Sequence, residues 1–265
     1  LLKNDGTLPL KNKKVALYGP GAARTIKGGT GSGEVNERHA VSVLEGMEER
    51  GFEITTRAWI EEYADFYVQA ERDYKEEKRR RINLLDPKTI NNMLFDNFRL
   101  PCGPTIEERH VQASDTDTCV YVLSRQAGEG GDRRAEAGDY YITEEERQAI
   151  AFCAQNYAHF VLLINCGSAM DMGFTQRIDG INAIVYICQP GSQGGLAVAD
   201  VLSGAVCPSG KLTDTWAKKY DDIPFANEYS HRNGDLKQEN YREGIFVGYR
   251  YFDSFDVEPT YPFGF

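Results

Sequence analysis

A single carboxylate in a glycine-rich loop is the side chain in this sequence best suited to chemistry. Glu129 lies in the segment SRQAGEGGDR, residues 124–133, which directly follows the apolar run of residues 119–123. That run has the length and β-branched content of a buried strand, and open α/β sheets bind ligands at the carboxyl ends of their strands. Flanking glycines let the backbone approach another surface closely. The pattern suits a carboxylic acid that donates a proton to a ligand.

The same segment, called the Glu129 loop below, has a plainer interpretation. Glycine- and aspartate-rich segments are common in turns, and a glutamate near Arg125 and Arg133 could belong to a solvated cluster of ion pairs. We expect Arg125 and Arg133 to pair with Asp132 or with other carboxylates and to support the loop. Taken alone, the loop favours the plainer interpretation.

A second glycine-rich loop, KGGTGSG at residues 27–33, follows another strand-like run at residues 15–18. It carries the hydroxyl of Ser32 and is called the Ser32 loop below. Because the carboxyl ends of parallel strands meet at one edge of a sheet, we expect the two loops to lie close together. The Ser32 loop lacks the closing Gly-Lys-Ser/Thr of a P-loop, and residues 19–24 lack the third glycine of a dinucleotide fingerprint. We therefore expect no nucleotide and no cofactor.

Strand-like and helix-like segments alternate along the chain. Residues 160–165 and 183–188 are further apolar, strand-like runs, and Gly204 is placed to end a helix over residues 196–202. Continuous rather than alternating apolar residues indicate strands buried on both faces, which is typical of a parallel sheet between layers of helices. Residues 59–116 look like an insertion, in which Tyr63, Phe66, Ala70 and Tyr74 share one face of a predicted helix.

Composition narrows the function classes. The net charge of −10 argues against nucleic acid or an anionic membrane surface as a partner, and no apolar run approaches the ~20 residues of a membrane span. The six cysteines form no CxxC pair and the four histidines are far apart, so we expect no metal site. Cysteines scattered through apolar segments are typical of a reducing compartment, which predicts a cytoplasmic protein.

Six segments, taken in order, resemble the second domain of family 3 glycoside hydrolases, the β-glucosidase group. They are residues 1–10, 27–33, 124–133, 189–212, 241–252 and 261–265. The resemblance implies an α/β sandwich packed against a TIM-like barrel. We therefore expect residues 1–265 to form one three-layer α/β/α sandwich with a mainly parallel six-stranded sheet, flavodoxin-like, with 59–116 as an insertion.

The resemblance also implies a function. Glu129 corresponds to the acid/base glutamate of retaining β-glycosidases, and Ser32 corresponds to a serine that touches the sugar. The aspartate nucleophile of such enzymes lies in the barrel, which residues 1–265 do not contain, so we expect a longer natural protein. The implied activity is hydrolysis of terminal β-linked sugars from a β-glycoside or oligosaccharide, and this chain should be inactive without its barrel. A barrel-facing apolar surface would favour homo-oligomers.

Two other classes stay open. One is a non-catalytic carbohydrate-binding or structural module with the same fold. The other is a flavodoxin-like domain for a ligand or nucleotide, which would need a phosphate-cradling loop that this sequence does not show.

Overall fold

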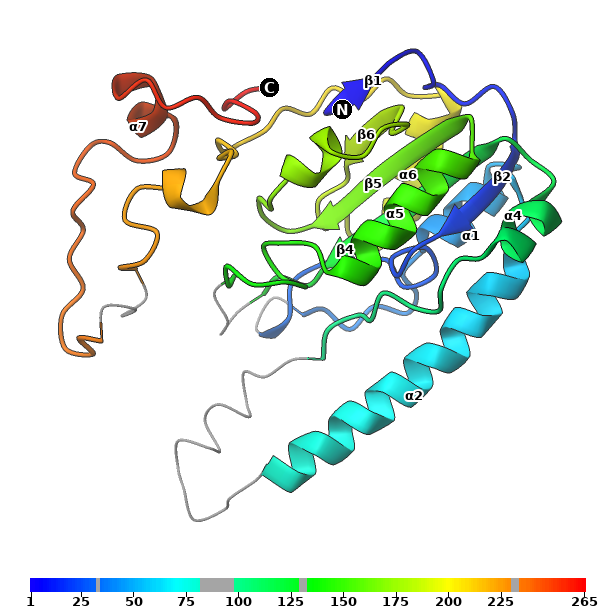
Figure 1. The fold of residues 1–265 in the computed structure, drawn as a ribbon, viewed down its shortest axis with the longest axis horizontal. Coiled ribbons are helices and arrows are strands. Elements are labelled where there is room, and N and C mark those ends of the chain that lie inside the picture. Colours follow the sequence, from blue (N-terminus) through cyan, green and yellow to red (C-terminus); the bar gives the residue numbers. More distant parts are fainter. Residues whose placement is uncertain (32–33, 82–97, 129–132, 230–233) are drawn as a thin grey trace. The chain divides into compact units, whose positions relative to one another are not determined.

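The computed structural model describes residues 1–31, 34–81, 98–128, 133–229 and 234–265 (Figure 1). The chain divides into two compact units. The first comprises Leu1–Gly131, Glu144–Ser168 and Asp179–Pro208, and the second comprises Asp132–Thr143, Ala169–Ile178 and Ser209–Phe265. The sheet and both glycine-rich loops up to Gly131 belong to the first unit.

The sheet of the first unit has six strands in the order β1-β6-β5-β4-β2-β3. Strands β2 to β6 run parallel, and β1 pairs antiparallel with β6 at one edge. The predicted six-stranded, mainly parallel sheet is therefore confirmed. The strands are β1 (Lys3–Asn4), β2 (Lys14–Tyr18), β3 (Glu53–Ile54), β4 (Thr118–Arg125), β5 (His159–Cys166) and β6 (Ala183–Tyr186).

The central strands of the sheet are buried on both faces, because helices cover both sides of it. All eight residues of β4 are buried, as are seven of the eight in β5. Helix α5 (Glu144–Asn156) packs on β4 and β5, while α1 (Val43–Glu49) and α6 (Gly194–Ser203) pack against each other on the opposite face (Figure 1). This arrangement is the expected three-layer sandwich.

Helices α1 and α6 can approach closely because each carries a glycine at the contact. A Cβ atom added to Gly46 would collide with the backbone of Gly195, and one added to Gly195 would collide with the carbonyl of Ser42. Ser42 also caps α1, since its hydroxyl accepts a hydrogen bond from the backbone N–H of Glu45. Gly204, with φ +78°, ends α6 as predicted.

The segment predicted to be an insertion, residues 59–116, starts within one long helix, α2 (Arg57–Arg81), and α4 (Glu108–Ser114) follows further along the chain. The predicted helix is present, and of the residues expected on one of its faces Tyr63 is buried whereas Phe66 is 43% exposed. Tyr67, the next residue along α2, contacts Arg24, whose guanidinium carbon lies 3.4 Å from the centre of the ring.

No helix in the described part of the chain has the length and apolar character needed to cross a membrane.

The order of the parallel strands places a topological switch between β2 and β4. From β2 the chain crosses first to β3 on one side, and then to β4, β5 and β6 on the other. This is the flavodoxin-like order, and such sheets bind ligands outside the carboxyl ends of the two strands at the switch. The loops that follow β2 and β4 are the ones that contain Ser32 and Glu129.

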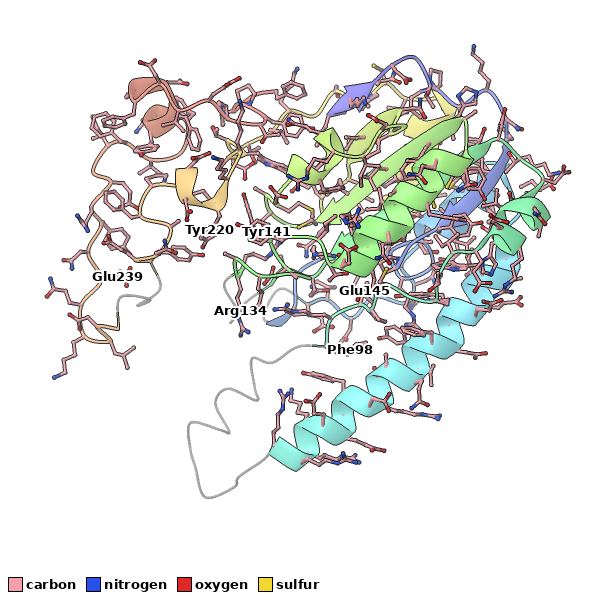
Figure 2. All side chains as sticks on the ribbon, in the orientation of Figure 1. Phe98, Arg134, Tyr141, Glu145, Tyr220 and Glu239 are labelled. Atoms are coloured by element: carbon pink, nitrogen blue, oxygen red, sulfur yellow. The ribbon has the colours of Figure 1, made fainter. Side chains whose placement is uncertain are left out.

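The second unit is built largely around aromatic rings. Tyr140, Tyr220 and Ala226 form a buried cluster against which Tyr141 packs, and Figure 2 labels Tyr141 and Tyr220. The ring of Tyr140 meets Tyr141 and Tyr220 edge-on, at centroid distances of 5.1 and 5.2 Å. Its one α-helix among the described residues is α7 (Tyr249–Ser254).

Candidate active site

The two glycine-rich loops lie against each other at the carboxyl ends of β2 and β4. Gln126 Nε2 donates a hydrogen bond of 3.1 Å to the carbonyl of Gly28. A Cβ atom added to Gly29 would lie 3.1 Å from the carbonyl oxygen of Ala127, and one added to Gly128 would collide with the backbone N–H and hydroxyl of Thr30. The predicted proximity of the loops is therefore confirmed, and glycine is required at Gly128 for this contact.

Three of the predicted site residues, Ser32, Glu129 and Asp132, lie outside the described residues, because they fall within 32–33 and 129–132. Their immediate neighbours are described, however. Gly128 directly precedes Glu129, and Thr30 stands two residues before Ser32, so the contact between Gly128 and Thr30 joins the two loops within two sequence positions of each candidate site residue.

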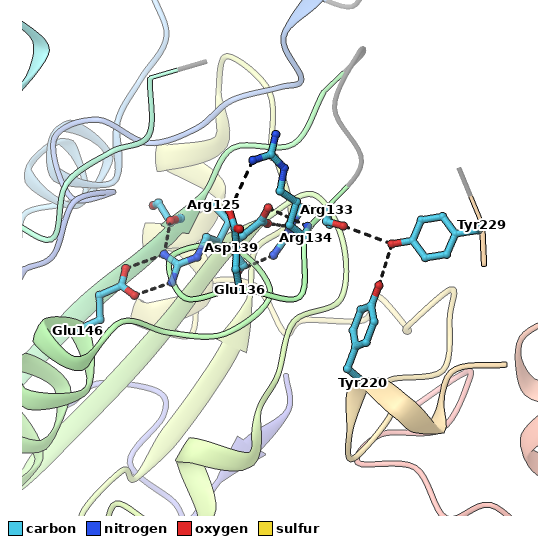
Figure 3. Close-up of polar contacts among 9 residues, drawn as sticks. Arg125, Arg133, Arg134, Glu136, Asp139, Glu146, Tyr220 and Tyr229 are labelled. Carbon is cyan, nitrogen blue, oxygen red and sulfur yellow. Dashed lines mark hydrogen bonds and ion pairs between the residues drawn. The ribbon is translucent and has the colours of Figure 1, made fainter. Parts of the chain in front are cut away.

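Arg125, the last residue of β4, forms a buried ion pair with Glu146 in the first turn of α5. The guanidinium donates two parallel hydrogen bonds to the carboxylate, of 2.6 and 2.5 Å (Figure 3). The two side chains are 5% and 3% exposed. Nη1 of Arg125 also donates to the carbonyl of Ser124, at 2.9 Å. Bidentate pairing of this kind fixes the orientation of the arginine as well as balancing its charge.

Arg133 makes a corresponding pair within the second unit. Its Nε contacts Asp139 Oδ1, and its Nη2 donates a 2.7 Å hydrogen bond to the carbonyl of Asp139 (Figure 3). The other carboxylate oxygen of Asp139 accepts from the backbone N–H of Arg134 at 2.9 Å. Tyr229 donates to the carbonyl of Arg133 at 3.3 Å and shares a 2.9 Å hydrogen bond with Tyr220. Both arginines thus pair with carboxylates, Arg125 with Glu146 and Arg133 with Asp139.

Sequence reasoning missed Asn165, which lies near the end of β5 and is completely buried. Its Oδ1 accepts hydrogen bonds from the backbone N–H of Ile26 at 2.7 Å and from the hydroxyl of Ser124 at 3.1 Å. Its Nδ2 donates to the carbonyls of Ile26 at 2.9 Å and Cys188 at 2.7 Å. The signal in the sequence is a lone amide at the end of the apolar run 160–164, a polar group that must find partners when buried.

The segment after β6 also reaches the Glu129 loop. Gln189 Nε2 donates a 2.9 Å hydrogen bond to the carbonyl of Ala127. The preceding residue, Cys188, is exposed and has φ +53°, a left-handed conformation that is uncommon for residues other than glycine. The expected strand through residue 188 is therefore too long, since β6 ends at Tyr186.

A hollow of about 450 Å³ lies at the opposite, amino-terminal edge of the sheet. It is bordered by Asp5, by the starts of β4 and β5 at Thr118 and His159, and by Asn182. Because parallel sheets bind ligands at the carboxyl edge, this hollow is not the candidate site.

In the described part of the chain, no group of three or more histidine, cysteine, aspartate or glutamate side chains is arranged to hold a metal ion.

Comparisons with known proteins agree with the resemblance found in the sequence. The glycosyl hydrolase family 3 C-terminal domain matches residues 1–249. A β-glucosidase of Ruminococcus albus is 34% identical over 268 residues, which cover the whole chain and 26% of that protein. A β-glucosidase of Bacteroides ovatus is 30% identical over 273 residues, covering 99% of the chain and 32% of that protein.

Solved structures give the same result. The chain superimposes on β-glucosidase 3B of Thermotoga neapolitana, solved in complex with glucose, with a TM-score of 0.76 and 32% identity, covering 99% of this chain and 35% of that one. A β-glucosidase of Paenibacillus barengoltzii gives a TM-score of 0.78 at 27% identity, covering 99% and 27%. The chain thus spans about a quarter to a third of the length of these relatives. It belongs to the glycosyl hydrolase family 3 C-terminal domain family.

Proposed function

We propose that this chain is the acid/base-carrying domain of a retaining β-glycosidase of the β-glucosidase type. In this proposal Glu129 donates the proton, Ser32 contacts the sugar, and a barrel joined to this chain supplies the aspartate nucleophile. The relatives named above are β-glucosidases, and one was solved with glucose. The substrate would be a β-glycoside or oligosaccharide that ends in a β-linked sugar.

One observation carries the proposal: Gly128 packs against Thr30 at the topological switch of the sheet. This contact brings the backbone next to Glu129 and the segment that leads to Ser32 to the edge where sheets of this order bind ligands. A glutamate at that edge can face a neighbouring domain, as a two-domain active site requires.

The chemistry needs two carboxyl groups ~5–5.5 Å apart on opposite sides of the glycosidic bond. The nucleophile attacks the anomeric carbon, while the second group protonates the departing oxygen. That second group then takes a proton from water, which hydrolyses the glycosyl-enzyme intermediate. A chain that carries one of the two groups cannot complete either step, so this chain alone should be inactive on an aryl β-glucoside.

The two arginines that flank Glu129 in the sequence would support it. The positive charge of Arg125 is matched by Glu146, and that of Arg133 is matched by Asp139. An arginine whose charge is balanced in this way favours the ionised form of a nearby glutamate less than an unbalanced one would. We propose that Arg125, Asp132 and Arg133 hold the Glu129 loop and take no part in proton transfer.

The test replaces Glu129 by glutamine in the longer protein that includes the barrel. Activity on a β-linked disaccharide should fall by about 10²–10⁴-fold, because its leaving group needs protonation. A 2,4-dinitrophenyl β-glucoside should lose much less in the glycosylation step, and added azide should restore turnover and yield the β-glycosyl azide. The matched control is the exposed Glu145→Gln, which should behave as wild type.

Two results would overturn the assignment. If Glu129→Gln hydrolyses the disaccharide at the normal rate, Glu129 is not the acid/base group. If the longer protein binds glycans but has no hydrolase activity at all, the chain belongs to a non-catalytic carbohydrate-binding module.

A further inference from the structure

Asn165 connects three chain segments at the carboxyl edge of the sheet. One amide contacts Ile26 after β2, Ser124 near the end of β4, and Cys188 after β6. The side chain is fully buried, and both its donor and its acceptor atoms are used. Such a group resists displacement, because moving it would leave buried polar atoms without partners.

The Asn165 side chain pairs with the backbone of Ile26 through two hydrogen bonds, one accepted and one donated, as the backbone of a neighbouring strand would. Oδ1 accepts from the Ile26 N–H and Nδ2 donates to the Ile26 carbonyl, so both backbone groups of that residue are fixed. Ile26 directly precedes the Ser32 loop. The position of that loop relative to β5 is therefore set, at the residue just before the loop, by the Asn165 side chain.

The same oxygen of Asn165 fixes the start of the other loop. Ser124, which is 3% exposed, donates its hydroxyl to Oδ1 at 3.1 Å. Ser124 is adjacent to Arg125, and Glu129 follows five residues after Ser124. One oxygen atom, Asn165 Oδ1, thus accepts hydrogen bonds from residues at the starts of both loops that carry the proposed site residues.

A second path leads from Asn165 to the Glu129 loop. Nδ2 donates to the carbonyl of Cys188, whose left-handed backbone conformation needs such support. The next residue, Gln189, donates to the carbonyl of Ala127, two residues before Glu129. The amide therefore reaches the Glu129 loop both through Ser124 and through the segment after β6.

We propose that Asn165 is a positioning residue for the reaction, which sets the distance between Glu129 and the sugar held at the Ser32 loop. This inference rests on the proposed function. It differs from a general role in stability, because proton donation depends on placement to within about an ångström, and an error of that size can cost ~100-fold in rate.

The chain offers a matched control at the opposite edge of the sheet. Asn182 accepts from the backbone N–H of Phe160 at 2.8 Å and donates to Asp5 Oδ2 at 2.8 Å. Like Asn165, Asn182 uses its side-chain amide to hydrogen-bond neighbouring segments, but it does so at the amino ends of the strands. Loss of Asn182 should affect stability without affecting the placement of Glu129.

The experiment compares Asn165→Ala, Asn165→Asp, Ser124→Ala, Asn182→Ala and Glu129→Gln in the longer protein. Active sites are counted by trapping with a 2-deoxy-2-fluoro β-glucoside that has an activated leaving group, and kcat/KM per active site is measured. The substrates are a β-linked disaccharide and a 2,4-dinitrophenyl β-glucoside. Their ratio reports protonation of the leaving group and is insensitive to the fraction of folded protein.

Asn165→Ala should lower the disaccharide value by roughly 10-fold or more and the dinitrophenyl value much less. Asn165→Asp, which keeps the acceptor but loses both donated bonds, should change the ratio in the same direction, and Ser124→Ala should do so more weakly. Asn182→Ala should leave the ratio at the wild-type value. If Asn165→Ala fails to fold, Asn165→Asp and Ser124→Ala decide the question.

The outcomes separate the two proposals. If Glu129→Gln changes the ratio while the Asn165 and Ser124 variants do not, Asn165 has only a structural role and the inference is overturned. If Asn182→Ala changes the ratio as much as Asn165→Ala, position at the carboxyl edge is irrelevant and the inference is again overturned. If Glu129→Gln leaves the ratio unchanged, the proposed function itself fails.

Discussion

Arg125 and Glu146 form a bidentate ion pair that is almost entirely removed from solvent and ties the end of β4 to the first turn of α5. The Glu129 loop begins at this end of β4 and leads towards the start of α5. The ion pair therefore holds the two ends of one connection at a fixed separation. A buried charge without its partner is costly, so the pair should be far more sensitive to mutation than the exposed pairs nearby.

The first prediction concerns stability. Glu146→Gln should lower the free energy of unfolding by about 3–5 kcal/mol, because it removes the carboxylate that pairs with the buried Arg125 guanidinium. The measurement is urea-induced unfolding followed by circular dichroism. The control is Glu144→Gln, which disrupts the exposed Arg147–Glu144 pair in the same helix and should cost no more than about 1 kcal/mol. Equal losses in the two variants would show that the buried pair has no special role.

The fold was largely predictable from the sequence, and the reasons are visible in particular strands. β4 and β5 are continuous apolar runs, so their burial and parallel pairing follow from composition alone. β1 and β3 have only two residues each and carry no such pattern. β3 is short because α2 already begins at Arg57, three residues after β3 ends at Ile54.

The site was less predictable, because its contacts join residues far apart in the chain. The proximity of the two loops follows from their places after parallel strands. The partner of Arg125 could not be predicted from the order of elements, since Glu146 is 21 residues further along and belongs to the next helix. Asn165 contacts Ile26 across 139 residues of sequence, and only the sheet order brings them together.

The second prediction concerns the contact between the loops. Gly128→Ala should reduce kcat/KM for a disaccharide by roughly 10-fold or more in the longer protein, because the added methyl group meets the Thr30 backbone, which cannot rotate away. Gly28→Ala is the control, since its Cβ would have no atom within 4 Å and its φ is not positive. Should both variants keep wild-type activity, close packing of the loops is not needed for function.

The third prediction concerns thiol reactivity. Cys188 and Cys207 are exposed, whereas Cys119, Cys153 and Cys166 are buried, and burial raises the pKa of the partly buried Cys102 to about 11. Because the thiolate is the reactive species, this chain should show two rapidly reacting thiols with a chromogenic disulfide at pH 8 and six after denaturation. The paired change Cys188→Ser and Cys207→Ser should abolish the rapid phase. A rapid phase that survives this change would mean that a buried thiol is accessible.

The fourth prediction is a loss of stability at alkaline pH. Burial raises the pKa of Tyr157 to about 12 and that of its hydrogen-bonded neighbour Tyr18 further still, and their hydroxyl oxygens lie 3.0 Å apart. A tyrosine in the unfolded chain ionises near pH 10. Between pH 10 and 12 the unfolded state therefore binds fewer protons than the folded state, so the free energy of unfolding must fall as pH rises.

Each tyrosine that stays protonated in the fold should contribute a slope of up to about 1.4 kcal/mol per pH unit in this range. Urea unfolding at several pH values from 9 to 11.5 measures the slope. Tyr157→Phe should make it shallower, even though the variant starts from a lower stability because Tyr157 also donates to Ser114 Oγ at 3.2 Å. Tyr241→Phe, at a side chain that is 85% exposed, should leave the slope unchanged. The two variants should differ because stability depends on alkaline pH only through a proton that the folded state binds more tightly than the unfolded state. If the slope of unfolding free energy against pH is the same in both variants, Tyr157 ionises with the fold intact.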